Sequence, residues 1–304
     1  MTKELQYDVI IIGGSYAGLS AAMALGRSIR KTLIIDGGDP CNKQTPQSHN
    51  FLTQDGETPA AIAEKALEQV LKYPTVELLQ GFVVELEQQD NVFVVTTAAG
   101  ERFAGMKILL ATGVKDELCD IPGFAECWGI SVLHCPYCHG YEVRQQKTAI
   151  LAKGEEAYHL GLLLHNWASD ITLLSDGDHG LEDIQLDLLK ANSVELIDEK
   201  VTALTHEDGR LKSIQFESGK TMPVEVMYSR VPFTLHSEIA SQIGCDLSES
   251  GHILVDAAQK TTIPGIYAAG DCTTNGRAVS IAVAAGSRAG MMINSELIFG
   301  QVKK

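Results

Sequence analysis

The sequence predicts an α/β protein built from two similar domains, with the second domain inserted into the first. Short apolar runs alternate with helical stretches, which is typical of a parallel sheet covered by helices. This strand-then-helix pattern starts twice, at Tyr7 and again at Lys147. The later segment from Gly251 to Asp271 returns to strands and a glycine turn, so we expect the C-terminal stretch to complete the first domain. The expected boundaries are 1–116 and 243–304 for the first domain and 117–242 for the second.

Composition narrows the class of protein and of partner. The 304 residues are 45% hydrophobic and carry a formal charge of −15 without any basic run, which argues against nucleic acid or an anionic membrane as the main partner. A polar start and an early apolar run broken by glycines resemble neither a signal peptide nor a membrane span, so we expect a cytoplasmic protein. Seven cysteines with one close pair do not resemble a secreted disulfide framework.

The individual elements follow from apolar spacing and from turn residues. Thr58 and Pro59 read as an N-cap and a first helical position, and Ile62, Ala66 and Val70 form one apolar face behind them. A hairpin is expected from 93–97 and 102–104 around a turn at 99–100, placed before the next parallel strand. Five apolar runs bounded by glycine or charge are expected as parallel strands: 9–12, 33–35, 107–110, 148–151 and 171–174.

A glycine-rich turn follows the first strand and suits a dinucleotide site. The next strand ends at Asp36, whose carboxylate can accept hydrogen bonds from ribose hydroxyls. Gly13 allows a tight turn, Gly18 allows the helix to pack closely on the strand, and the helix start offers free N–H groups to a pyrophosphate. Ser15 stands where the usual motif has its second glycine, and an ordinary structural turn is the alternative. The turn reads Gly13-Gly14-Ser15-Tyr16-Ala17-Gly18.

The pair Cys135 and Cys138 is the candidate reactive centre. Two cysteines three apart at a helix start can close a disulfide, and the helix dipole lowers the pKa of a thiolate there. His139 adds a side chain that can carry a proton near neutral pH. Half of a zinc site is the alternative, but there is no second CxxC or HxxxH, so we predict redox chemistry and no metal.

Two further motifs show a resemblance to a known family. Residues 261–271, TTIPGIYAAGD, and the triplet Ala111-Thr112-Gly113 resemble the FAD-binding signature of the pyridine nucleotide-disulfide oxidoreductases. The resemblance implies non-covalent FAD, with Asp271 contacting its ribityl chain and a helix near Ala278 pointing at its pyrimidine edge. His49 lies in a stretch that passes near the flavin in this family, with an ordinary loop histidine as the alternative. The other expected FAD contacts are Gly37, Asn42, His49, Val83, Gly270, Val279 and Ser280.

The cysteine pair narrows the resemblance to the low-molecular-weight thioredoxin reductases. That family implies a homodimer, a flavin-proximal thiolate at Cys138, an interchange cysteine at Cys135, and His139 in place of an acid–base aspartate. The runs CPYCHGYE and GGSYAGLSAA, with 42–56, look like the branch of gliotoxin- and holomycin-type dithiol oxidases. In that branch a small dithiol becomes a cyclic disulfide, and reduced FAD passes electrons to dioxygen.

The second nucleotide fold lacks the features of an NADPH site. Its glycine motif reads Ala152-Lys153-Gly154-Glu155-Glu156-Ala157, and no arginine follows the next strand to bind a 2′-phosphate. We therefore expect NADPH binding to be lost or weak. Asp176 could hold the ribose of NADH, and the alternative is that it is a solvated turn residue before Gly177. Three alternatives remain: an NAD(P)H-dependent reductase of thioredoxin or a disulfide, a non-catalytic flavin-binding regulator, and an enzyme that takes electrons from an iron–sulfur protein.

Overall fold

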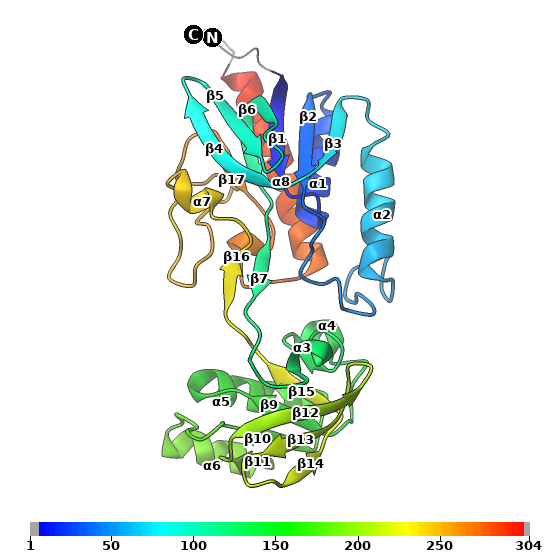
Figure 1. The fold of residues 1–304 in the computed structure, drawn as a ribbon, viewed down its shortest axis with the longest axis vertical. Helices are drawn as coiled ribbons and strands as arrows, with labels where there is room; N and C mark the ends of the chain where they lie inside the picture. Colours follow the sequence, from blue (N-terminus) through cyan, green and yellow to red (C-terminus); the bar gives the residue numbers. More distant parts are fainter. Residues whose placement is uncertain (1–5, 301–304) are drawn as a thin grey trace. The chain divides into compact units, whose positions relative to one another are not determined.

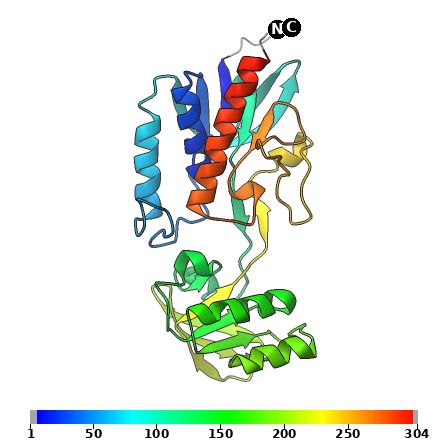
Figure 2. The ribbon, with the colours of Figure 1, turned by 180° about the vertical axis from the view of Figure 1, so that it is seen from behind.

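The computed structural model describes residues 6–300, which divide into two units (Figure 1 and Figure 2). Unit 1 comprises residues 6–43, 50–115 and 233–300, and unit 2 comprises residues 44–49 and 116–232. Each unit contains helices and a parallel sheet, so the predicted α/β fold is confirmed. The chain returns to unit 1 at 233, whereas the sequence-based division placed that return at 243. Residues 44–49 join unit 2, which the sequence division did not anticipate.

Unit 1 is built on a central parallel sheet. Its strands follow the order β3-β2-β1-β6-β17, and all neighbouring strands in this order run parallel. Val9, Ile10 and Ile11 are fully buried, as expected for a strand covered on both faces. The strands are β1 (Tyr7–Ile12), β2 (Thr32–Asp36), β3 (Val76–Gln80), β6 (Arg102–Leu110) and β17 (Ile266–Ala268).

Strand β6 is the point at which a second layer branches from this sheet. Its first half pairs antiparallel with β5 (Val92–Thr97), which in turn pairs with β4 (Val83–Gln89). Its second half pairs with β1 on one edge and β17 on the other. The predicted hairpin is present, but its second arm and the predicted strand at 107–110 are one continuous strand. A single long β6 therefore joins the hairpin to the sheet.

The long helices of unit 1 are α1 (Tyr16–Arg27), α2 (Pro59–Val70) and α8 (Val279–Phe299). Helix α8 packs against α1, and Figure 2 shows the two side by side on one face of the sheet. This contact needs Gly286, because a Cβ there would lie 2.0 Å from the carbonyl oxygen of Ala17. The Ser20 hydroxyl also crosses this contact and donates to the carbonyl oxygen of Val283 at 2.7 Å. The start of α8 is thereby fixed close to the start of α1.

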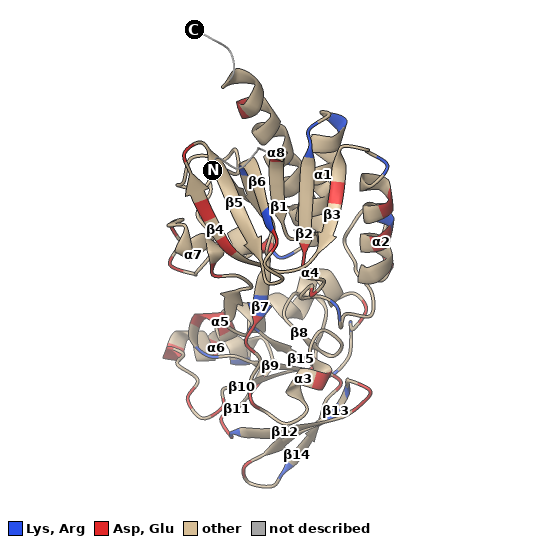
Figure 3. Cartoon of the chain, turned by 45° about the horizontal axis from the view of Figure 1, so that its top comes forward, with Lys and Arg blue, Asp and Glu red and all other residues tan. Residues whose placement is uncertain are grey.

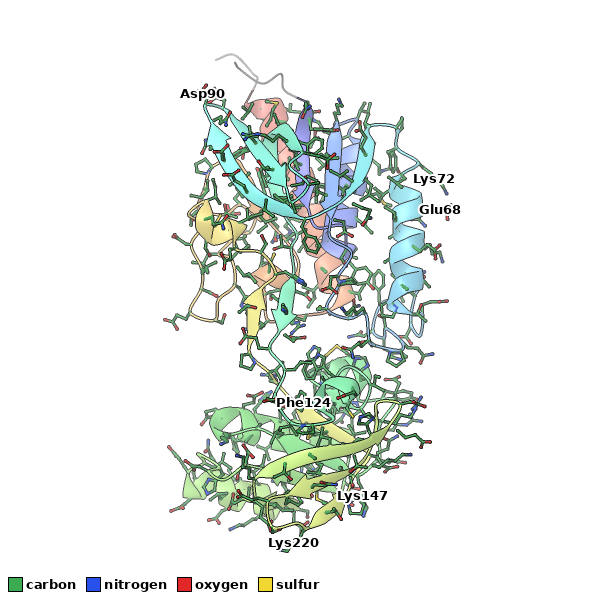
Figure 4. All side chains as sticks on the ribbon, viewed as in Figure 1. Glu68, Lys72, Asp90, Phe124, Lys147 and Lys220 are labelled. Atoms are coloured by element: carbon green, nitrogen blue, oxygen red, sulfur yellow. A yellow bond between two sulfur atoms is a disulfide. The ribbon has the colours of Figure 1, made fainter. Side chains whose placement is uncertain are left out.

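Helix α2 (Pro59–Val70) begins where the sequence predicts. The Thr58 hydroxyl accepts a hydrogen bond from the backbone N–H of Ala61 at 3.1 Å, and Pro59 occupies the first turn. Its outer face carries an ion pair between Glu68 and Lys72 at 3.0 Å, and both side chains are labelled in Figure 4. The helix thus has the expected capped start and a solvated outer face.

Unit 2 repeats the architecture of a parallel sheet with helices on one face. The strand order is β11-β10-β9-β15-β8, and every neighbouring pair is parallel. Helices α5 (Gly154–Leu163) and α6 (Asp183–Ala191) lie on one face, and a three-stranded antiparallel sheet lies on the other (Figure 1). The predicted strands 148–151 and 171–174 match β9 and β10. The strands are β8 (Val132–Leu133), β9 (Thr148–Leu151), β10 (Ile171–Leu174), β11 (Val194–Ile197), β12 (Val201–Glu207), β13 (Arg210–Phe216), β14 (Thr221–Pro223) and β15 (Val226–Ser229).

Short elements complete the described chain. Strands β7 and β16 pair where the chain leaves and re-enters unit 1. Acidic and basic residues are interspersed along the chain of both units in Figure 3, consistent with the absence of a basic run in the sequence. Within residues 6–300, no helix has both the length and the apolar character needed to cross a membrane. The short elements are β7 (Val114–Asp116), α3 (Phe124–Cys127), α4 (Pro136–His139), η1 (Leu164–Asn166), β16 (Phe233–Leu235), α7 (Ile239–Gln242) and η2 (Asp271–Thr273).

Candidate functional site

Unit 2 holds a disulfide between Cys135 and Cys138, the only one among residues 6–300. Strand β8 ends just before this pair, and the chain then turns into α4, with Cys135 as its N-cap. The backbone N–H of Cys138 donates to Cys135 Sγ at 3.1 Å. Helix α4 has only four residues, so its dipole adds less than the sequence suggested.

The buried thiols of the described chain are poor candidates for redox chemistry. Burial raises the pKa of the Cys127 and Cys245 thiols, and it raises that of Cys272 to about 11. A thiol must lose its proton to act as a nucleophile, so these groups are inert at physiological pH. These three thiols are therefore excluded as the reactive centre, whereas Cys41 is exposed and Cys119 is half-buried.

His139 closes the short helix and lies beside the disulfide in the chain. Burial, with a smaller contribution from the nearby His49, lowers the pKa of His139 to about 4. His139 is therefore neutral at physiological pH and able to accept a proton. His49 belongs to the segment 44–49 of unit 2, where its Nδ1 lies 3.6 Å from Glu142 Oε1. Sequence reasoning assigned no role to Glu142, because a single carboxylate in a loop carries no signal of its partner.

The glycine turn of unit 1 has the geometry of a dinucleotide site. A Cβ at Gly13 would lie 2.2 Å from the carbonyl oxygen of Ala111, and one at Gly18 would lie 1.9 Å from that of Gly13. The backbone N–H of Gly14 donates to Asp36 Oδ1 at 2.8 Å, so the turn and the end of β2 are tied together. The first turn of α1 contains no acidic side chain, and its N–H groups therefore suit a phosphate.

The other predicted FAD contacts gather at the same edge of the unit 1 sheet. Residues 13–18, 36–37, 111–113 and 270–271 follow the carboxyl ends of β1, β2, β6 and β17, which are parallel strands. Ligands of open parallel sheets bind at this edge. The start of α8, with Val279 and Ser280, carries no acidic side chain in its first turn. Asn42 Nδ2 donates to the Tyr16 hydroxyl at 3.4 Å, and Val83 begins β4.

Asp271 has a cationic neighbour that sequence reasoning missed. Arg277 Nε lies 3.7 Å from Asp271 Oδ2, and the Cys41 thiol lies 3.8 Å from the same oxygen. Gly270 has a φ of 87°, which a glycine adopts at no steric cost. The sequence does not predict this contact, because a loop, unlike a helix or strand, has no regular repeat that brings residues six apart together.

We predict that Gly18→Ala empties the dinucleotide site. A Cβ only 1.9 Å from the Gly13 carbonyl oxygen forces the turn apart, at a cost of about 3 kcal/mol. The purified variant should lose most of its flavin absorbance per mole of protein and unfold at a lower temperature. Gly81→Ala is the matched control, since a Cβ there meets nothing within 4 Å. Normal flavin content in Gly18→Ala would show that the turn does not hold the cofactor.

The corresponding helix start in unit 2 is arranged differently. Glu155 and Glu156 occupy the first turn of α5, and the backbone N–H of Gly154 already donates to the carbonyl oxygen of His179 at 2.8 Å. Gln185 Nε2 donates to Glu155 Oε1 at 2.6 Å, and Arg230 Nε lies 3.7 Å from Glu156 Oε1. The chain's own groups therefore occupy this helix start. Two carboxylates lie in its first turn, and the Gly154 N–H already donates to a carbonyl oxygen.

The loop after β10 is also engaged within unit 2. The Asp176 carboxylate accepts a hydrogen bond from the backbone N–H of Val201 at 3.0 Å, and Lys153 Nζ donates to the Asp176 carbonyl oxygen at 3.2 Å. Asp176 has a φ of 53°, as in a tight turn. The Asp176 side chain, which would have to bind an NADH ribose, thus already holds the backbone of Val201.

The model of the family "Pyridine nucleotide-disulphide oxidoreductase" matches residues 7–286. The chain belongs to this family. Pyridine nucleotide-disulphide oxidoreductases of the thioredoxin reductase type use FAD, with NAD(P)H as the usual reductant, and act on sulfur groups. The residues of unit 1 fit FAD, because helix starts without acidic side chains and positive-φ glycines converge on one sheet edge.

Individual relatives in the family are thioredoxin reductases by name. Thioredoxin reductase sirT of Leptosphaeria maculans is 31% identical, covering 96% of this chain and 94% of its own length. Thioredoxin reductase aclD of Aspergillus oryzae is 31% identical, covering 98% of each chain. Both support the resemblance to the gliotoxin-type branch of the family.

Solved structures give the same result. The putative thioredoxin reductase TrxB of Bacillus anthracis superposes with a TM-score of 0.93 at 31% identity, over 98% of this chain and all of that one. The structure of HlmI superposes with a TM-score of 0.91 at 32% identity, over 98% of this chain and 95% of that one. The predicted pair of Rossmann-like domains and the predicted resemblance are confirmed.

Proposed function

We propose that this oxidoreductase removes two electrons from a small dithiol through the Cys135–Cys138 disulfide and does not use NAD(P)H as its donor. FAD, when bound, supplies the acceptor for the electrons of the reduced cysteine pair, and dioxygen or another acceptor takes them in the end. The substrate class follows the sequence resemblance to dithiol oxidases. The redox pair and the residues of unit 2 do the thiol chemistry.

The start of α5 is the observation that carries the proposal. Binding of a pyridine nucleotide depends on pyrophosphate and 2′-phosphate contacts remote from the reacting carbon. Here Glu155 repels a phosphate, the Gly154 N–H is engaged by His179, and no arginine follows β10. Each lost charged hydrogen bond costs about 1.5 to 3 kcal/mol, so losing two weakens binding about a hundredfold or more.

The exchange itself needs only the groups of unit 2. A substrate thiol gives its proton to a base, and the thiolate attacks Cys135 Sγ while the electron pair of the S–S bond moves to Cys138 Sγ. The second substrate thiol loses its proton and attacks the substrate sulfur of the mixed disulfide. Cys135 then leaves and takes up a proton. The dithiol has become a cyclic disulfide, and the two electrons reside on the enzyme dithiol.

The proposed FAD site consists of the residues at the carboxyl edge of the unit 1 sheet. Asp36 is the proposed ribose ligand, Asp271 the ribityl ligand, and the starts of α1 and α8 face the phosphates and the flavin. The His49 contact with flavin remains a prediction, since the structure describes His49 beside Glu142 in unit 2. The full set is Gly13, Gly14, Ser15, Ala17, Gly18, Asp36, Gly37, Asn42, Val83, Ala111, Thr112, Gly113, Gly270, Asp271, Val279 and Ser280.

An NAD(P)H-dependent reductase of a thioredoxin-like protein is the second candidate. The names of the relatives favour it, since sirT, aclD and TrxB are all called thioredoxin reductases. The two candidates share the cysteine pair and the cofactor, and they differ in the direction of electron flow and in the role of the second nucleotide fold.

A binding measurement separates the two candidates. Calorimetric titration of the FAD-loaded protein with NADPH and with NADH should show no saturable binding below about 0.1 mM, because an ordinary micromolar site is weakened at least a hundredfold. A thioredoxin reductase from the same family, titrated under the same conditions, is the positive control. Saturable micromolar binding of either nucleotide would return this protein to the NAD(P)H-dependent reductases.

A further inference from the structure

Three ionisable side chains belong to the redox turn of unit 2 or contact it. His139 and Glu142 come from the turn itself, and His49 comes from the segment 44–49, which is distant in sequence. The segment is anchored on unit 2 by a hydrogen bond from Gln44 Nε2 to the carbonyl oxygen of Ala125 at 3.2 Å. Ser48, next to His49, is 6% exposed. His49 is thus held beside the turn by its own segment.

The backbone fixes Glu142 relative to His139. The N–H of Glu142 donates to the carbonyl oxygen of His139 at 3.2 Å, so the two residues are joined through one turn of chain. Glu142 Oε1 lies 3.6 Å from His49 Nδ1, and the His49 side chain is 15% exposed. His49 also lies close enough to His139 for its charge to disfavour the protonated form of His139. The Glu142 carboxylate therefore lies next to His49, and His49 lies near enough to His139 for their charges to interact.

The remaining groups near Glu142 do not compete for its carboxylate. Arg144 stacks on the Tyr141 ring at 4.1 Å and donates to the Tyr141 carbonyl oxygen at 2.5 Å. Tyr228 is 1% exposed, its hydroxyl has no hydrogen-bond partner among the described residues, and burial with the nearby Glu142 raises its pKa. The Tyr228 phenol is neutral and the Arg144 guanidinium is bound to Tyr141. His49 is therefore the side chain that Glu142 can orient.

We propose that Glu142 is a positioning residue that orients His49, and that His49 shares with His139 the transfer of substrate protons at the Cys135–Cys138 pair. This inference rests on the dithiol exchange proposed above. Two substrate thiols must each lose a proton, and the Cys135 thiolate must gain one. The two imidazoles can each accept one proton, and one imidazolium then returns its proton to Cys135. The Glu142 carboxylate stabilises the imidazolium formed at His49 and keeps its ring in place.

A single turnover tests the inference without an electron acceptor. The FAD-loaded protein is mixed anaerobically with dithiothreitol, and the oxidised dithiothreitol formed is quantified against time at several concentrations. We expect Glu142→Gln to lower the maximal rate about tenfold and to leave the half-saturating concentration unchanged. His49→Gln should cost about the same, and the double variant should be no slower than either single one. Glu142→Asp should recover at least half of the rate.

Glu217→Gln is the matched control, because it removes an exposed carboxylate of the same unit and should leave the rate unchanged. A full rate in Glu142→Gln, a change confined to the half-saturating concentration, or multiplied losses in the double variant would each overturn the inference. If the unaltered protein forms no oxidised dithiothreitol, the proposed function itself fails and the inference fails with it.

Discussion

Replacing either Cys135 or Cys138 by serine should abolish dithiol oxidation, lowering the rate at least about a thousandfold. The reason is chemical: exchange requires an S–S bond that can be attacked, and one remaining thiol cannot accept two electrons. The structure places Cys135 at the N-cap of the four-residue helix α4 and Cys138 within that helix, with their Cα atoms 5.3 Å apart. The measurement is formation of the substrate disulfide under air.

The two variants should differ in what they trap. Cys138→Ser retains the proposed interchange cysteine and should form a stable mixed disulfide at Cys135 with the disulfide of a monothiol, because one thiol of that reagent leaves and cannot reattack; the adduct is seen as an added mass on the peptide that contains Cys135. Cys119→Ser is the matched control, since it removes a half-buried thiol of the same unit and should stay within about twofold of the unaltered rate. Trapping only in Cys135→Ser would reverse the assigned order of the two cysteines.

His139→Asn should slow the exchange about a hundredfold at pH 7, because it removes a neutral base beside the reacting sulfurs. Burial and the nearby His49 lower the pKa of His139 to about 4, so in the native protein it can accept a proton at any pH above about 5. The measurement is the single-turnover rate between pH 4 and pH 8. A loss of less than about threefold would show that His139 is not the base.

The same variant should change how stability depends on pH. The pKa of His139 is lower in the folded chain, about 4 against 6.5, so the unfolded chain binds more protons between these values. Its contribution to the free energy of unfolding is therefore smallest below pH 4, rises with pH through this window by at most about 3 kcal/mol, and is level above pH 6.5. His139→Asn should flatten this rise in denaturant titrations. An unchanged slope would mean that His139 is not buried as described.

Much of the framework could be predicted because it depends on local patterns. Strands β9 and β10 match their predicted bounds, since each is a short buried run with a clear end. Thr58 predicted the start of α2, because a side-chain cap and a first-turn proline act within one turn. The Cys135–Cys138 disulfide could also be predicted, because the two cysteines are only three residues apart.

The remaining features depend on contacts that spacing does not reveal. The two predicted pieces of β6 are one strand, because Gly105 pairs both with Phe93 of the hairpin and with Tyr7 of β1. The segment 44–49 joins unit 2 although it lies within the first domain in sequence. The closure of the α5 start by His179 arises from a loop 25 positions after Gly154, and no local motif signals such a contact.

The source of the electrons is the central claim, and anaerobic mixing tests it most directly. The FAD-loaded protein is mixed separately with NADPH, NADH and a small dithiol, and its visible spectrum is followed before and after admission of air. The account predicts that both nucleotides leave the yellow colour unchanged, that the dithiol bleaches it through Cys135 and Cys138, and that air restores it, with hydrogen peroxide if oxygen is the acceptor. Rapid, saturable bleaching by micromolar NADPH, with no bleaching by the dithiol, would contradict it.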